Sequence, residues 1–173
     1  SVRTNIMFMN PDRPFRRILV TSAAPAEGKT TVACSIAIAM AQSGKRVVIV
    51  DCDMRKPRLH RIFDRAGDAG LTNFLVGDAG IEEVVKPTII DNLCCVPAGP
   101  IPPNPADMLH SERFKKFLDQ LSDLFDLVVL DSQVVEDGVR LVVPLLQPER
   151  PRDLREQHQP VRALGQVGGL AEP

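Results

Sequence analysis

Residues 21–31 read TSAAPAEGKTT, and this stretch limits the possible folds more than any other part of the chain. It has the spacing of a phosphate-binding loop: Ala23, four further residues, then Gly28, Lys29 and Thr30. In such a loop, successive backbone N–H groups point into a concavity at a helix N-terminus. The lysine reaches the β and γ phosphates, and the Thr30 hydroxyl ligates Mg²⁺. The pattern therefore predicts a strand, this loop and then a helix.

The flanking residues have the composition that this arrangement needs. Residues 17–22, RILVTS, form a short β-branched run that is typical of a strand. Residues 30–43 are apolar on most faces, which indicates a buried helix, and Gly44 follows where a glycine commonly ends one. We therefore expect the loop to bind a nucleotide. The residues predicted to contact it are Ala26, Glu27, Gly28, Lys29, Thr30 and Thr31.

Further apolar runs predict strands that alternate with helices. Residues 45–51 and 126–131 are continuous apolar runs of the kind that parallel sheets bury on both faces, and residues 92–99 are another candidate. Alternation of strands and helices favours a parallel sheet with right-handed crossovers. The expected fold is α/β: a P-loop NTPase-like, mostly parallel sheet flanked by helices.

A helix is also predicted after the proline-rich turn at residues 100–105. Asn104 suits the N-cap, with Pro105 at the first helical position and Asp107 at the third. The helix that follows has apolar residues at i, i+3 and i+4 spacing on one face. These residues are Phe114, Phe117, Leu118, Leu121, Leu124 and Phe125.

Three aspartates follow or end the predicted strands. Asp51 and Asp53 come at the end of the strand after the loop helix, and Asp131 ends the strand at 126–131. Because ligands of an α/β sheet bind at the carboxyl ends of its strands, these acids and Lys29 should converge. One carboxylate can hold Mg²⁺ and another can accept a proton from an attacking hydroxyl. The alternative is that all three are ordinary turn residues; Asp126, which precedes its strand, is interpreted as structural.

Composition excludes several classes of protein. A formal net charge of -1 gives no basis for non-specific binding to nucleic acid. No apolar run approaches the roughly 18 residues of a membrane span, and the first ten residues have no signal-peptide pattern. The four cysteines lack a zinc-site spacing and are interpreted as reduced thiols that serve as small hydrophobes. The basic run RKPRLHR at residues 55–61 either docks an acidic tail or membrane headgroups, or is a solvated loop face.

Composition also divides the chain. Residues 1–16 are expected to be a polar lead-in segment and residues 17–146 the P-loop domain, in which 139–146 is one more candidate strand. Residues 147–173 are rich in Pro, Arg, Gln and Gly and are expected to be a poorly structured tail. The change begins at about Ser132, and we interpret it as the sign of a fragment or of a divergent or frame-shifted C-terminal third, with an incomplete fold there as the consequence.

The combination of SAAPAEGKTT, VVIVDCDMRKP and LVVLD resembles the bacterial tyrosine kinases (BY-kinases) of capsule and exopolysaccharide systems. Two further segments, GLTNFLVG and AGPIPPNPADMLHS, are similar to segments characteristic of that family, and RTNIMF near the start is similar to its opening segment. The resemblance covers residues 3 to about 132. The proline-rich segment makes it specific, because generic P-loop proteins do not carry it.

The resemblance implies a role for each matching position. Lys29 would grip the phosphates of ATP, and Thr30 would ligate Mg²⁺. Asp53 and Asp131 would hold the metal directly or through water, and Asp51 would accept the tyrosine proton, so that Lys29, Asp51 and Asp53 form the catalytic set. Arg55 would brace the loop after Asp53. Arg3 resembles the last arginine of the family's oligomerisation motif, which implies a homo-oligomer.

The implied function is that of a non-specific protein-tyrosine kinase, a transferase that moves the γ-phosphoryl of Mg-ATP to a tyrosine-containing protein and regulates polysaccharide synthesis and export. The implied location is cytoplasmic, at the inner face of the plasma membrane, through a transmembrane co-polymerase or adaptor module; nucleic acid is not an expected partner. The alternatives are a partition-type P-loop ATPase or a truncated nucleotide-binding remnant. The partition-type loop has an additional lysine where this chain reads Ala-Ala-Pro-Ala-Glu.

Two departures from the family pattern affect this expectation. The chain contains no tyrosine, so it cannot phosphorylate itself on tyrosine and must act on a partner. After Asp131 and Ser132 the chain continues with Gln133 and Val134, where the family has two prolines.

Overall fold

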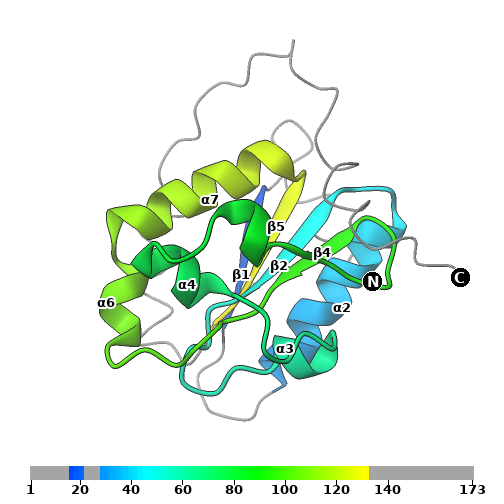
Figure 1. Ribbon diagram of the computed structural model, residues 1–173. Coiled ribbons are helices and arrows are strands. Elements are labelled where there is room, and N and C mark those ends of the chain that lie inside the picture. The colour runs from blue at the N-terminus through cyan, green and yellow to red at the C-terminus, as the bar shows by residue number, and fades with distance from the viewer. Residues whose placement is uncertain (1–15, 22–27, 133–173) are drawn as a thin grey trace, which may run out of the picture.

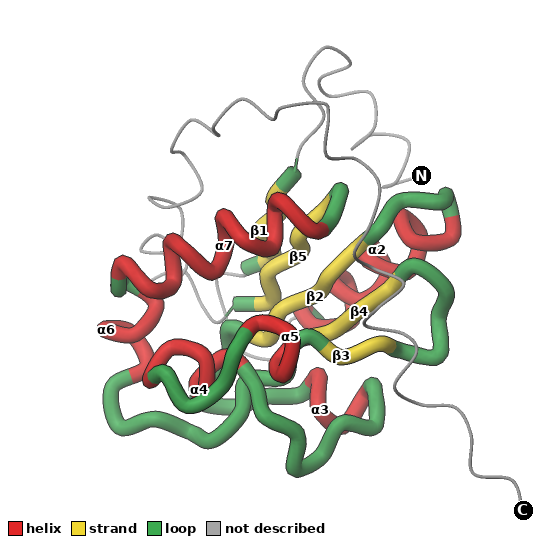
Figure 2. Tube along the Cα trace, turned by 45° about the horizontal axis from the view of Figure 1, so that its top comes forward, coloured by secondary structure: helices red, strands yellow, loops and turns green. Residues whose placement is uncertain are grey.

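The computed structural model describes residues 16–21 and 28–132, which form a five-stranded sheet with helices on both faces (Figure 1). The strand order is β1-β5-β2-β4-β3 (Figure 2). All neighbours pair in parallel except β3, which is antiparallel to β4. The strands are β1 Arg17–Val20, β2 Val47–Asp51, β3 Lys86–Pro87, β4 Leu93–Val96 and β5 Leu127–Asp131. The predicted mostly parallel α/β sheet is confirmed.

The centre of the sheet is formed by β2 and β5, which are buried along their whole length. Their register pairs Val47 with Leu127 and ends with Asp51 opposite Asp131. Every residue between those ends is Val, Leu or Ile, so both faces of each strand can pack against helices. The continuous apolar runs in the sequence therefore mark the two central strands.

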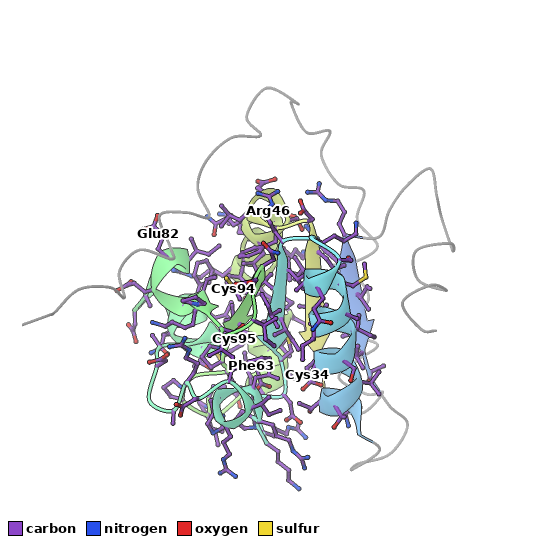
Figure 3. The ribbon with its side chains drawn as sticks, turned by 90° about the vertical axis from the view of Figure 1, so that its right-hand side faces the viewer. Cys34, Arg46, Phe63, Glu82, Cys94 and Cys95 are labelled. Atoms are coloured by element: carbon purple, nitrogen blue, oxygen red, sulfur yellow. The ribbon has the colours of Figure 1, made fainter. Side chains whose placement is uncertain are left out.

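The helices form two layers around this sheet. Helices α2 (Lys29–Gln42) and α3 (Leu59–Ile62) pack on one face, where Leu59 joins the side chains of α2 in one hydrophobic cluster. The other face carries the remaining helices, whose buried residues share a second cluster. They are α4 Leu71–Val76, α5 Ile81–Val84, α6 Pro105–Leu109 and α7 Glu112–Leu124. Figure 3 shows α2 on one side of the sheet and the second layer on the other.

Helix α2 is the longest helix of its layer and lies close to the sheet. Ala33, Ala37 and Ala41 are at most 1% exposed, and their small side chains let the helix backbone approach the strands. The helix begins after Gly28, which has φ of 79°, and ends before Gly44, which has φ of 89°. Both angles lie in the left-handed region that favours glycine. The predicted loop helix and its glycine terminus are confirmed.

The helix expected after Asn104 is divided into two. Helix α6 ends at Leu109, and Ser111 starts α7 by accepting a hydrogen bond from the Phe114 backbone N–H at 3.2 Å. Asn104 is the N-cap of α6, as predicted, but its side chain makes no capping hydrogen bond. The break has a local cause, because the Ser111 side chain accepts the hydrogen bond of the Phe114 N–H, which in a continuous helix would be accepted by a carbonyl of the preceding turn. The predicted apolar face is confirmed on α7.

The segment between β4 and α6 is held against the start of α4. The backbone N–H groups of Leu71 and Thr72 donate to the carbonyls of Pro97 and Ala98 at 2.8 and 2.9 Å. A Cβ placed on Gly70 would lie 2.2 Å from the Pro97 carbonyl oxygen, so only glycine allows this approach. Residues 97–99 are therefore fixed in place beside the carboxyl end of β4.

Within the described ranges, no helix is long and apolar enough to cross a membrane. The predicted lead-in segment apart from Arg16, the candidate strand at 139–146 and the tail at 147–173 lie outside the described residues.

Candidate functional site

The carboxyl ends of three neighbouring strands bring the predicted acids together. Val20, the last residue of β1, is in register with Asp131, and Asp131 is in register with Asp51. Lys29 and Thr30 are the first two residues of α2. The Lys29 ammonium and the Thr30 hydroxyl both lower the pKa of Asp131. The structure thus places the first turn of the loop helix beside the strand ends that carry the acids.

Asp131 is the most unusual group of this site. The residue is 1% exposed, and neither carboxylate oxygen accepts a hydrogen bond of ordinary geometry from the described residues. Burial raises the pKa of Asp131, Asp53 raises it further, and the nearby Thr30 hydroxyl and Lys29 ammonium lower it. A buried carboxylate without partners is costly unless a cation or donor completes its surroundings. The position therefore fits a group that holds a hydrated cation.

Asp51 is completely buried and is engaged by the backbone that follows it. Its Oδ2 accepts hydrogen bonds from the N–H groups of Arg58 and Leu59, both at 2.9 Å. Its Oδ1 accepts one from the Asp53 N–H at 3.2 Å. The carboxylate thus fixes the loop after β2 and the start of α3, a structural role that the sequence did not indicate because the donors come seven and eight residues later.

The charge state of Asp51 reflects two opposing influences. Burial raises its pKa to about 7, and the Asp131 and Asp53 carboxylates also raise it, although the backbone donors at Leu59 and Arg58 lower it. A carboxyl group whose pKa lies near neutrality is suited to take up and release a proton. Its assignment as the acceptor of the tyrosine proton stays a prediction.

Asp53 lies outside the strand and in a different environment. The β2 strand ends at Asp51, so the two acids do not continue on one strand face. Asp53 is half-buried, and its Oδ1 accepts a hydrogen bond from the Lys56 N–H at 2.8 Å. Its charge acts on both Asp51 and Asp131, which places it in the same cluster.

The predicted nucleotide-contacting residues are described only in part. Lys29 and Thr30 are half-buried in the first turn of α2, and Thr31 is exposed. Gly28 is the N-cap, and its carbonyl accepts a hydrogen bond from Val32 at 3.0 Å. Ala26 and Glu27 lie outside the described residues.

Two cysteine thiols adjoin the acid cluster, which the sequence reading missed. Cys34 lies one turn after Thr30 on the sheet-facing side of α2 (Figure 3). Burial raises the pKa of its thiol to about 11, and the carboxylates of Asp131 and Asp51 raise it further. Cys52, between the two acids of the β2 end, is also buried, and its pKa is raised well above the ordinary value for the same reasons. Both thiols are therefore neutral at pH 7. The available signal in the sequence was their position, four residues after Thr30 and directly after Asp51.

Comparison with known proteins assigns the domain. A family model described as an AAA domain (AAA_31) matches residues 17–135. The chain belongs to this family, and its domain is of the BY-kinase type. It is 37% identical over 131 residues to the putative tyrosine-protein kinase CapB of Staphylococcus aureus. The matched region covers 76% of this chain and 58% of CapB. It is 38% identical over 132 residues to the tyrosine-protein kinase YwqD of Bacillus subtilis (strain 168), covering 76% and 56%.

Solved structures agree with this assignment. The crystal structure of the chimerical protein CapA2B2 matches with a TM-score of 0.78 at 36% identity, covering 82% of this chain and 64% of that one. The septum site-determining protein MinD from Pyrococcus horikoshii, complexed with Mg-ADP, matches with a TM-score of 0.63 at 21% identity, which shows the shared fold alone. The chain spans somewhat more than half the length of CapB and YwqD, and 18% of the length of the tyrosine-protein kinase Wzc of Salmonella typhimurium.

Proposed function

We propose that this chain is the catalytic domain of a protein-tyrosine kinase that transfers the γ-phosphoryl group of Mg-ATP to a tyrosine of another protein. The family assignment supports the kinase over a partition-type ATPase or an inactive remnant. The single structural observation that carries the proposal is the carboxylate of Asp131, which is buried beside Lys29 and Thr30 and accepts no hydrogen bond of ordinary geometry from the described residues. A carboxylate in this state is explained by the metal ion of a bound nucleotide.

The residues of the cluster fit ATP and Mg²⁺. Lys29 would bind phosphate oxygens, and the Thr30 hydroxyl with Asp131 and Asp53 would hold the metal directly or through water. When bound, the metal neutralises the charge that develops on the transferring phosphoryl group. Gly28 and the start of α2 would direct backbone N–H groups to the same phosphates, as helix N-termini do. Ala26, Glu27 and Thr31 would complete the contacts to the nucleotide.

The acceptor hydroxyl needs a group that takes its proton. We assign this to Asp51, with Asp53 as the second acid of the catalytic set. Oδ2 of Asp51 already accepts two N–H groups, whereas Oδ1 accepts only the longer bond from Asp53. The proton would therefore pass from the tyrosine oxygen to Oδ1, while phosphoryl transfer depends mainly on positioning and charge neutralisation.

The wider role follows the relatives. Their names include the tyrosine-protein kinases Wzc and CpsD, and one structural neighbour is the chimerical protein CapA2B2. We infer that this domain regulates capsule or exopolysaccharide synthesis, works in the cytoplasm at the membrane with a transmembrane co-polymerase or adaptor module, and forms a homo-oligomer. The substrate is a tyrosine-containing protein.

The experiment uses purified chain, labelled ATP, Mg²⁺ and a tyrosine-rich peptide. Because the chain contains no tyrosine, every phosphotyrosine must lie on the peptide. Lys29→Met and Asp51→Asn should each lower peptide phosphorylation by about 100-fold or more. Lys116→Met, an exposed lysine of α7, is the matched control and should leave the rate unchanged.

Far-UV circular dichroism and thermal unfolding of each variant separate loss of chemistry from loss of fold. Free phosphate without phosphotyrosine would instead assign the chain as an ATPase. Neither product from a folded chain that binds no ATP would assign it as a remnant.

A further inference from the structure

A basic cavity of about 740 Å³ lies next to the acid cluster, between the loop that follows β2 and the loop that follows β4. Its volume is within the range of binding sites for organic ligands, and is far larger than the roughly 30 Å³ that one water occupies. One wall is formed by the loop after Asp53 and by α3. Its charged lining consists of Arg55, Lys56, Arg58, Arg61, Arg65 and the carboxylate of Asp68.

The lining of this cavity is predominantly positive, because its cationic side chains outnumber the single carboxylate of Asp68. Lys56, Arg58 and Arg61 are exposed, and none of them forms an ion pair with another described residue. Arg65 points its Nη2 to the Pro87 carbonyl, while its Nε is buried without a hydrogen-bond partner among the described residues. Several like charges around one concavity concentrate a positive potential that attracts anionic groups.

The opposite wall is apolar and fixed. It contains Pro97, Pro100 and Ile101, whose side chain is 65% exposed at the cavity. The hydrogen bonds from the start of α4 hold Pro97 and Ala98 in place. A cavity with a charged wall and an apolar wall suits a polypeptide segment that carries both kinds of side chain, and suits a flat lipid surface or a single inorganic anion less well.

The cavity is joined directly to the acid cluster. Arg58 lines it, and the backbone N–H of the same residue donates to Asp51 at 2.9 Å. Lys56 also lines it, and its N–H donates to Asp53 at 2.8 Å. A polypeptide whose tyrosine reaches these aspartates would therefore place neighbouring residues at the cavity.

We propose that this basic cavity binds an acidic segment of the acceptor polypeptide, through glutamate or aspartate side chains that flank the tyrosine. The proposal rests on the proposed kinase function in one respect, namely that the bound polypeptide is the acceptor of the phosphoryl group. It gives the basic run at residues 55–61 a role in substrate choice, since a neutral peptide would gain only the apolar contacts. The cavity selects the substrate, and the acid cluster carries out the reaction.

The test measures binding without ATP. Two labelled peptides of equal length contain phenylalanine in place of the acceptor tyrosine, one flanked by glutamates and the other by glutamines. Fluorescence anisotropy gives the Kd of each for the full chain, for Lys56→Gln/Arg61→Gln and for the control Lys45→Gln/Lys116→Gln. Both double variants remove two positive charges, but the control residues lie outside the cavity.

The glutamate peptide should bind the unaltered chain more tightly than the glutamine peptide. The cavity variant should weaken its binding about fivefold and reduce its dependence on salt, because each exposed charge contributes modestly. The control variant should leave the Kd of both peptides unchanged. Thermal unfolding confirms that both variants fold, since the substituted side chains are exposed or half-buried.

Equal binding of the two peptides, or equal weakening in the control, would disprove the proposal. Binding of inorganic phosphate or of vesicles containing anionic lipid that depends on Lys56 and Arg61, without binding of the glutamate peptide, would also disprove it. If the peptide binds as expected but no phosphotyrosine forms on its tyrosine form, the kinase function fails while the ligand of the cavity stands.

Discussion

The two ends of strand β5 show how one residue type serves two purposes. Asp126, just before the strand, accepts hydrogen bonds from the Arg46 backbone at 2.9 Å and from its guanidinium at 2.7 Å. Asp131, at the other end, is buried with no such partner among the described residues. At the amino-terminal end of β5 the protein itself supplies the partners of the acid, whereas we propose that a ligand completes the surroundings of the acid at the carboxyl-terminal end.

The pKa values of the two acids differ in the same way. Burial raises the pKa of Asp126, but the hydrogen bonds and charge of Arg46 outweigh this and leave it below its ordinary value. Burial raises the pKa of Asp131 and no such set of donors overcomes it. Groups whose surroundings oppose their charged form tend to gather at functional sites, so the difference supports our proposal that Asp131 has a functional role and Asp126 a structural one.

Of the substitutions at the two ends of β5, Asp131→Asn should have the larger effect, and it should lower activity without lowering stability. Loss of the charged ligand should reduce peptide phosphorylation by about 100-fold, equivalent to about 2.7 kcal/mol of barrier. Without Mg²⁺ at pH 7 the variant should be no less stable than the unaltered chain, because it removes a buried charge. Kinetics and urea unfolding measure the two effects. A strongly destabilised variant would show that Asp131 is structural.

Asp51→Ala tests whether the carboxyl-terminal edge contains a structural acid as well. Removing the side chain leaves the buried N–H of Leu59 and the N–H of Arg58 without their acceptor, which should cost about 2 kcal/mol of unfolding free energy. Asp53→Ala, at a half-buried position, is the comparison and should cost less. Equal costs in urea unfolding would contradict the anchoring role of Asp51.

Asp126→Asn should have the smallest effect, and on stability alone. The Asp126–Arg46 pair is about one-third exposed, so we expect a loss of about 1 kcal/mol at pH 7 with no change in phosphorylation. The folded-state pKa of Asp126 is lowered, so its contribution is fully present above the unfolded value of about 4 and is lost as the pH falls through the lower folded-state pKa. The difference in unfolding free energy between the two proteins, measured in urea, should therefore be smaller at pH 3 than at pH 7. An undiminished difference at pH 3 would rule out the ion pair as its source.

Local patterns predicted much of this molecule. The alternation of apolar runs with a glycine-bounded helix was sufficient for the central strands, α2 and the fold, because buried parallel strands have few alternative arrangements. Asp126 was correctly interpreted as structural from its position before the strand. The gathering of Asp51, Asp53 and Asp131 follows from the parallel order, and their chemical roles remain predictions.

What the sequence could not reveal depends on contacts between distant residues or on local competition. The hydrogen bonds that tie Asp51 to α3 require the loop between them to fold back. The division between α6 and α7 depends on the Ser111 side chain, which competes with the backbone carbonyls of a continuous helix for the Phe114 N–H. The cavity joins residues 55–61 to residues 97–101, which meet only after the sheet has formed.

The short strand β3 affects how copies of this protein behave at high concentration. It covers β4 at one edge of the sheet with Lys86 and Pro87, which pair with Cys95 and Cys94. Pro87 has no N–H to offer an incoming strand, and Lys86 would bring its charge into any ladder that formed there, two features that discourage edge-to-edge aggregation. On this side the protein therefore carries its own protection against polymerising through its sheet.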